Sequence, residues 1–439
     1  MGKDRNTDGV STFPADEKDL ASYQHASDAL SRLSTPAFLD SSKPVDRLFV
    51  AAFDGTGNSM FKDAPENHTN VAEVVKQLEQ SQPDGIGFGY VEGVGTQGGV
   101  AGARDLISGH TFEARLEEMY AQFVVQAALW LKENPDAEIR VASIGFSRGA
   151  EQAAGFARLV HERGIQNPEG MIIKRDANSL IESVEFTKPP LVEPGRTPQA
   201  VGLFDPVGTG EPRNHDRRLP PSVLSGFQIT AEDERRNLFQ STWLLDPGVT
   251  DQGRFLNVTV GGAHSNIGGS YQLNGLSIRS GNLMVDYLNS LSSEPFLAKR
   301  AEPTSPELNV VHRSEKHQFF YRTSVYDRAG TRGTVETLAP PTLCRLNCLD
   351  AEPRDGGMAA RFDFRPVSIM PPPASPEGPA ASTALRDAHS RLDGLLSGKI
   401  DPSMQSSWNR DVAAEAAALL PGSDRAVRSP QPQQPELIH

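Results

Sequence analysis

Residues 145 to 149 read Gly-Phe-Ser-Arg-Gly, a pattern that places a serine between two glycines. The apolar residues 138–146 predict a buried strand before the serine, and residues 148–163 predict a helix after it. A serine at a sharp strand-to-helix turn holds its hydroxyl clear of the sheet, and the helix N-terminus favours negative charge nearby. The pattern alone is common, but this context indicates that Ser147 is a nucleophile.

A serine hydroxyl is a weak nucleophile and needs a base, which an acid in turn orients. After an elbow of this kind, the acid and then the histidine follow at the ends of later strands. Asp205 ends the apolar run AVGLFD, and His264 lies in the glycine-rich stretch that follows the run FLNVTVGG. We therefore predict that Ser147, Asp205 and His264 form a catalytic set.

Other histidines and acids compete for these roles. His110 precedes the serine and so breaks the expected chain order. The carboxylates that compete with Asp205 are Asp233, Asp246 and Asp251, which lie in a polar stretch where charged side chains are usually solvated. Position therefore favours Asp205.

A second stretch, FVAAFDGTGNSMF at residues 49–61, ends a buried strand in Asp-Gly-Thr. Phosphatases that form a phospho-aspartyl intermediate place a nucleophilic aspartate two residues before this tripeptide, and Ala52 occupies that position here. The stretch instead predicts a backbone loop beside the elbow. The N–H of Gly55 or Thr56, paired with the N–H of Arg148, is expected to form an oxyanion hole.

The elements that position these residues alternate between short apolar runs and longer amphipathic segments. Strands are expected in LFVAAF, EIRVASIGF, AVGLFD and FLNVTVGG, and helices over residues 111–134, 148–163 and 276–291. Strands that alternate with helices predict an α/β fold with a mainly parallel central sheet. Residues 166–199 and 208–251 interrupt this alternation and are expected to be surface insertions.

The segments outside this region carry weaker signals. Residues 1–46 are polar apart from a predicted helix at 16–33, residues 366–382 have the composition of a disordered linker, and residues 384–420 allow one or two short helices. The expected division is an N-terminal extension (1–46), a catalytic domain (47–300), a part that packs on it or extends it (301–365), and a proline-rich linker with a short helical tail (366–439).

Composition narrows the function classes. The 439 residues carry a net charge of −13, which argues against nucleic-acid binding. No stretch reaches the roughly 18 apolar residues of a membrane span, and the first residues show no signal peptide, so export would need dedicated machinery. The only cysteines, Cys344 and Cys348, lack neighbouring histidines for a zinc site and are expected as free thiols or a local disulfide. No metal or other cofactor is expected.

Seven short motifs in order resemble one bacterial family. They are FDGTGN (53–58), TNV opening a helix (69–71), GVGT (93–96), GFSRGA (145–150), LFDPVG (203–208), AEDERR (231–236) and GGAHSNIGGSY (261–271). Each is moderately specific, but together they resemble the catalytic domain of the type VI secretion phospholipase effectors of the first lipase group, which have the α/β-hydrolase fold. The resemblance covers residues 47–292.

This resemblance implies a Ser-Asp-His hydrolase of glycerophospholipid acyl esters that is delivered to the periplasm of competing bacteria. It also implies peripheral membrane contact, a secretion-apparatus partner and an immunity protein in the producer. Two features depart from the family. Pro206 stands where the family has threonine. Many members carry a large membrane-docking region after the catalytic domain, whereas here about 147 residues follow residue 292, many of them in proline-rich stretches, so lipid access is expected to depend on the insertions.

Two other functions stay open at this stage: a soluble esterase or thioesterase for small acyl substrates, and a catalytically silent adaptor with a hydrolase fold. The C-terminal tail is also weakly similar to tails of type IV secretion effectors, so the sequence leaves the delivery route open. It likewise leaves open the acyl position, the head group and the oligomeric state.

Overall fold

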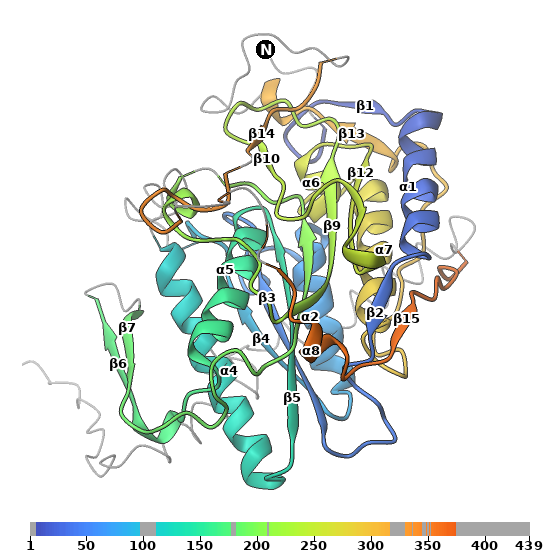
Figure 1. The fold of residues 1–439 in the computed structure, drawn as a ribbon. Helices are drawn as coiled ribbons and strands as arrows, with labels where there is room; N and C mark the ends of the chain where they lie inside the picture. The colour runs from blue at the N-terminus through green and yellow to red at the C-terminus, as the bar shows by residue number, and fades with distance from the viewer. Residues whose placement is uncertain are drawn as a thin grey trace, which may run out of the picture.

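The molecule is built around one seven-stranded sheet (Figure 1). The structure is a computed structural model that describes residues 6–96, 111–176, 181–208, 210–316, 330–335, 337–344, 348, 351 and 353–374. The strands follow the order β11 (Gly248–Thr250), β12 (Phe255–Val260), β9 (Val223–Ala231), β8 (Gln199–Phe204), β5 (Glu138–Phe146), β3 (Asp46–Phe53) and β4 (Ile86–Val91). All neighbouring pairs are parallel except β11 with β12, which confirms the predicted α/β fold.

Helices cover both faces of the sheet because its central strands are apolar throughout. Helices α4 (Phe112–Glu133) and α5 (Arg148–Arg163) pack on one face. On the other face lie α1 (Glu17–Leu30), α2 (Asn70–Ser81) and α7 (Gly275–Asn289) (Figure 1). Alternate residues of β3 feed the two cores, with Phe49 toward α4 and Val50 toward α2, as the two-residue period of a strand requires. Each core therefore fixes the register of the strands that carry the candidate residues.

Most of the predicted elements are confirmed within a few residues of their expected bounds. One expectation was wrong: residues 208–251 are not simply a surface insertion, because β9 lies fully buried between β8 and β12. The sequence did not predict this strand because β9 contains polar residues among its apolar ones. Gln228, for example, is completely buried, but its amide donates to the Thr242 carbonyl and accepts from the Leu245 N–H, so burying it leaves no polar atom unpaired.

The N-terminal helix α1 supports the strand that leads to His264. Asp16 caps it by accepting from the Asp19 N–H, a bond typically worth about 1 kcal/mol. Tyr23 is buried, and its hydroxyl donates to the carbonyl of Gly261 directly after β12. A Cβ at Gly261 would lie 2.7 Å from the Asp19 backbone, so only glycine allows this close approach.

Short elements tie flanking segments to the body. The two-stranded pairs are β1 (Thr12–Pro14) with β13 (Val310–His312), β2 (Ser34–Pro36) with β15 (Phe364–Pro366), β6 (Met171–Arg175) with β7 (Ile181–Phe186), and β10 (Ser241–Thr242) with β14 (Thr334–Val335). The described residues also form two short helices, α6 (His264–Gly268) and α8 (Gly356–Ala359). The division of the chain at residues 46, 300 and 365 stays a prediction.

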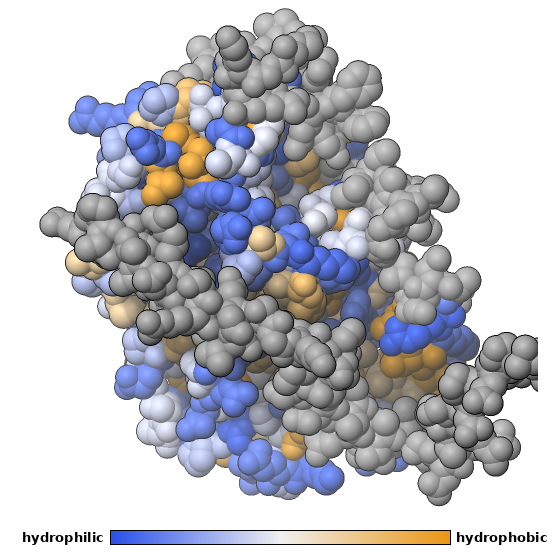
Figure 2. Space-filling model, turned by 180° about the vertical axis from the view of Figure 1, so that it is seen from behind, coloured by the Kyte–Doolittle hydropathy of each residue, from blue (hydrophilic) through white to orange (hydrophobic). Residues whose placement is uncertain are grey.

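Most of the described surface on one side is hydrophilic. Figure 2 shows hydrophobic residues there in separate patches. Within the described ranges, no helix combines the length and apolarity that a membrane crossing requires. Cys344 and Cys348 form a disulfide with 5.6 Å between their Cα atoms, which is the second of the two states expected from the sequence. The helices expected within 384–420 lie outside the described residues.

Candidate active site

Ser147, Asp205 and His264 follow the carboxyl ends of three parallel strands. These strands are β5, β8 and β12, and only β9 separates β8 from β12 in the sheet. The last residues of β5 and β8, Phe146 and Phe204, are paired neighbours. All three candidate residues therefore lie along one edge of the sheet, the place where open α/β folds bind ligands.

Ser147 occupies a strained turn between β5 and α5. Its φ of 61° and ψ of −125° fall in a region that non-glycine residues rarely adopt, and its N–H donates to the Phe204 carbonyl at 3.0 Å. Both flanking glycines are required: a Cβ at Gly145 would lie 2.1 Å from the Gly149 oxygen, and one at Gly149 would lie 2.4 Å from the Phe53 oxygen. The pattern Gly-x-Ser-x-Gly thus follows from close backbone packing at this turn.

Asp205 and His264 form a buried hydrogen-bonded pair. His264 Nδ1 lies 2.5 Å from Asp205 Oδ2, while the other carboxylate oxygen accepts from the Ala231 N–H at 2.9 Å. Burial opposes ionisation of Asp205, but the charge of Arg332 and the hydrogen bond from His264 outweigh it and lower the pKa of Asp205 to about 2. An ionised carboxylate only accepts, so Nδ1 carries the proton and Nε2 is the basic nitrogen.

Two aromatic rings enclose the imidazole of His264. The centroid of Phe146 lies 4.6 Å away and that of Phe239 lies 5.0 Å away, with Phe239 edge-on. His264 is only 4% exposed, and this burial lowers its pKa despite the opposing effect of Asp205. The neutral form therefore predominates near pH 7, and only that form can accept a proton.

The loop after β3 lies directly against the start of α5. The N–H of Gly55 donates to the Asp54 carboxylate at 2.7 Å, so that hydrogen is already engaged. Thr56 Oγ1 accepts from Arg148 Nε at 2.7 Å, which links this loop to the first turn of α5. Arg148 is buried at this contact. Of the three residues predicted for an oxyanion hole, Thr56 and Arg148 are thus joined and Gly55 is turned toward Asp54.

Asp54 is itself buried beneath this loop. Besides the Gly55 N–H, it accepts hydrogen bonds from Tyr90 Oη at 2.6 Å and Thr69 Oγ1 at 2.7 Å. Burial outweighs these bonds and raises the pKa of Asp54 to about 6. Asp54 therefore connects β3, β4 and the start of α2 directly behind the candidate oxyanion loop.

Replacing Asp54 by asparagine should remove the loss of folding stability that accompanies ionisation of this buried carboxyl group. Because the folded-state pKa of about 6 exceeds the unfolded value of 3.8, the stability that Asp54 contributes is greatest below pH 3.8 and is lost as pH rises through 6. The stability of the wild type relative to Asp54→Asn should fall by about 3 kcal/mol between pH 3 and pH 7. Denaturant unfolding of both proteins across this range measures the difference, and a constant difference would contradict the buried-acid assignment. Asp54→Asn should also impair activity less than Ser147→Ala does.

Four charged residues near the pair were missed or misjudged in sequence. Arg332 contacts Asp205, and Glu234 binds Arg236 at 2.9 Å beside His264. The motif AEDERR contains Glu234 and Arg236, but the sequence did not show where either side chain lies. Asp233 was expected to be solvated, but it is buried and accepts from the Gly262 N–H at 2.8 Å. His110, the rival histidine, lies outside the described residues.

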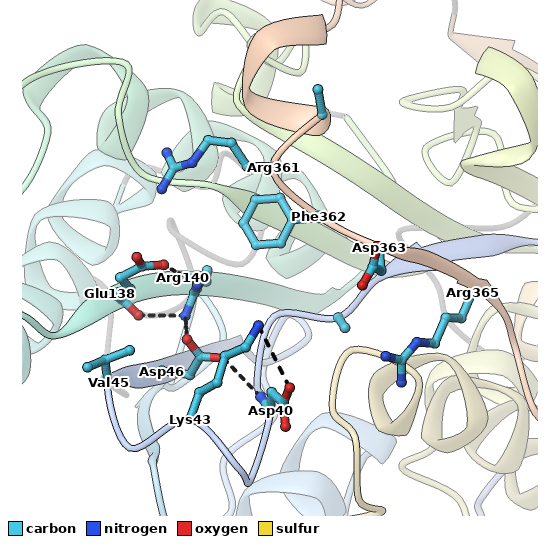
Figure 3. Close-up of a pocket in the computed structure, with 12 residues that line it drawn as sticks. Asp40, Lys43, Val45, Asp46, Glu138, Arg140, Arg361, Phe362, Asp363 and Arg365 are labelled. Atoms are coloured by element: carbon cyan, nitrogen blue, oxygen red, sulfur yellow. Dashed lines mark hydrogen bonds and ion pairs between the residues drawn. The ribbon is translucent and has the colours of Figure 1, made fainter.

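A separate pocket lies at the opposite end of the sheet. It has a volume of about 410 Å³ and is lined by the first residues of β3 and β5, Asp46 and Glu138 (Figure 3). Arg140 binds both carboxylates, at 2.6 and 2.5 Å, and these charges compensate one another. Within the described segments, no three histidine, cysteine, aspartate or glutamate side chains gather as a metal site.

A mainly parallel sheet covered by helices on both faces, with a serine elbow and an acid–histidine pair at its carboxyl edge, defines the class: the chain has an α/β-hydrolase fold. It belongs to the family described as T6SS phospholipase effector Tle1-like, catalytic domain, which matches residues 47–292. This confirms the resemblance inferred from the seven motifs. The description of this family names phospholipase effectors of the type VI secretion system.

Comparisons with solved structures find more distant similarity. The chain is 18% identical to an uncharacterized protein from Pseudomonas aeruginosa, covering 93% of this chain and 66% of that one with a TM-score of 0.42. It is 20% identical to the Tle1 effector bound to the VgrG spike of the type 6 secretion system (51% of each chain, TM-score 0.32). For Thermogutta terrifontis esterase 2 phosphorylated by paraoxon, the identity is 15% (58% and 88%, TM-score 0.28). No curated protein matches the chain in sequence. The chain spans less than two thirds of the first two structures.

Proposed function

We propose that this protein is a serine hydrolase that cleaves acyl esters of glycerophospholipids. The observation that carries this proposal is the buried Asp205–His264 pair at the sheet edge that also bears the strained Ser147. Such a pair has a specific chemical use, because an imidazole held neutral with its proton on Nδ1 presents a basic Nε2 to a neighbouring hydroxyl. The choice of a phospholipid ester rests on family membership.

In the proposed reaction, Ser147 Oγ attacks the ester carbonyl while His264 Nε2 takes the hydroxyl proton. Asp205 stabilises the resulting imidazolium through Nδ1. The tetrahedral oxyanion accepts hydrogen bonds from the N–H groups of Thr56 and Arg148, and each such donor typically contributes about 3 kcal/mol to the transition state. As the intermediate collapses, His264 returns the proton to the leaving alcohol. Water then hydrolyses the acyl-serine by the same steps, with His264 again as base.

The same proposal includes a biological setting. Family membership favours delivery by a type VI secretion system, with a component of that apparatus as a partner. We propose that the substrate is the membrane of a competing bacterium reached from its periplasm, and that the producer makes an immunity protein against the activity.

Two measurements separate this function from its rivals. Phospholipid vesicles incubated with the protein should yield free fatty acid and lysophospholipid by mass spectrometry, which also identifies the cleaved acyl position. Turnover of p-nitrophenyl butyrate without any vesicle product would instead indicate a soluble esterase. A fluorophosphonate probe should label the protein on the peptide that contains Ser147, and absence of both labelling and turnover would indicate a catalytically silent module.

A further inference from the structure

Arg332 reaches the candidate site from a part of the chain that lies beyond the family match. The match ends at residue 292, and β14, two residues after Arg332, pairs with β10 next to the site. The Arg332 side chain is 7% exposed, and its guanidinium contacts Asp205 Oδ1. It also donates to two backbone carbonyls, at 3.1 Å to Ala231 and at 2.7 and 3.0 Å to Phe239.

The two oxygens of the Asp205 carboxylate have different hydrogen-bond partners. Oδ1 accepts from Arg332 and from the Ala231 N–H, whereas Oδ2 accepts from His264 alone among the described residues. A carboxylate anchored through one oxygen cannot rotate freely, so the other oxygen keeps a fixed direction toward the imidazole. A guanidinium is well suited to this task because its planar N–H groups bind several acceptors at once.

The charge of Arg332 matters as much as its geometry. Asp205 is completely buried, and a buried carboxyl without a cation nearby tends to become protonated. Two other charged residues face the pair from the 234–236 segment, Glu234 and Arg236, and they bind each other at 2.9 Å. Among the described residues, Arg332 is therefore the cation that contacts the Asp205 carboxylate.

We propose that Arg332 is a positioning residue of the hydrolase, which keeps Asp205 ionised and oriented so that His264 holds its proton on Nδ1. This inference rests on the proposed function and extends it, because it makes residues after 292 part of the catalytic machinery. Arg332 itself takes no proton and acts only through Asp205.

The variant Arg332→Gln tests the proposal through its pH profile. Removing the cation raises the pKa of both Asp205 and His264, since each then gains a proton more easily. The acidic limb of kcat/KM for p-nitrophenyl butyrate should therefore move to higher pH by about one unit. At pH 7, kcat/KM should fall by up to about 100-fold, the effect of a slightly misplaced catalytic group. Arg332→Lys keeps the charge and should return the acidic limb close to its wild-type position.

Arg354 provides a matched structural control. It is also a buried arginine of the C-terminal segment that donates to backbone carbonyls, those of Leu219 and Pro220 at 3.0 Å each, but it does not contact the pair. Arg354→Gln should lower thermal stability and leave the pH profile in place. If Arg332→Gln behaves like Arg354→Gln, losing stability without a shift of the limb, Arg332 is only a structural tie and the proposal is wrong.

Two further measurements keep the proposal testable if a variant folds poorly or if the wild type has no esterase activity. A pocket of about 300 Å³ borders Arg332, so millimolar guanidinium should restore part of the activity of Arg332→Ala, whereas it should not help Arg354→Ala. If the wild type hydrolyses no ester, the proposed function fails, but the pKa of His264 can still be followed by NMR with 15N-labelled histidine. A His264 pKa that is equal in the wild type and Arg332→Gln would overturn the inference independently of activity.

Discussion

Ser147→Ala is expected to lower kcat for ester hydrolysis by roughly 10⁵- to 10⁶-fold while leaving the fold intact. Only the hydroxyl can form the acyl intermediate, and without it His264 has no nucleophile to activate. The residual rate would come from the oxyanion donors and from substrate binding. Release of fatty acid from vesicles, measured beside turnover of a soluble ester, gives the change, and unfolding curves verify that the variant is folded.

Ser143 supplies the matched control because it lies on the same strand, four residues before the elbow. It is buried, and its hydroxyl has no hydrogen-bond partner among the described residues. Ser143→Ala should therefore retain wild-type activity. Should Ser147→Ala keep full activity on both substrates, the nucleophile assignment is wrong whatever the control does.

Asp205→Asn is expected to lower kcat/KM by about 10⁴-fold near neutral pH. An asparagine can present its NH₂ group to the ring, which would place the imidazole proton on Nε2 and leave that nitrogen unable to accept from Ser147. The exposed Asp246, one of the competing acids, provides the control, and Asp246→Asn should be as active as the wild type. The pH profiles of all three proteins, measured with one soluble ester, give the comparison.

A loss of less than about tenfold in Asp205→Asn would show that His264 does not depend on this carboxylate. The buried Asp233 would then be the next acid to test, although it already binds the Gly262 N–H. Fluorophosphonate labelling rates of Asp205→Asn should fall in parallel with turnover, since the same base activates Ser147 in both reactions.

The sequence predicts the fold best where a strand is apolar throughout. LFVAAF and EIRVASIGF are buried on both faces, so they could be recognised without any partner. β9 could not, because Ser225, Gln228 and Thr230 interrupt its apolar residues and become acceptable only through internal hydrogen bonds. Those bonds depend on segments distant in the chain, which no local pattern reveals.

The candidate site likewise has parts that the sequence predicts and parts that it does not. The contact between Asp205 and His264 could be predicted from chain order and from the position of each residue at a strand end. Arg332 could not, because it lies 127 residues after Asp205 and binds mainly backbone carbonyls, which any sequence provides. The orientation of the Gly55 N–H depends on how the Asp54 side chain turns back on its own backbone, and this too is invisible in sequence.

The bond between Tyr23 and Gly261 has a consequence for biosynthesis. Helix α1 leaves the ribosome early, but its acceptor lies 238 residues later, and β1 must wait still longer for β13. A 14-residue helix of this composition has little stability alone, so during translation it exposes an apolar face that awaits β12. Helix α1 therefore docks long after its own synthesis, and closing such a long loop slows folding.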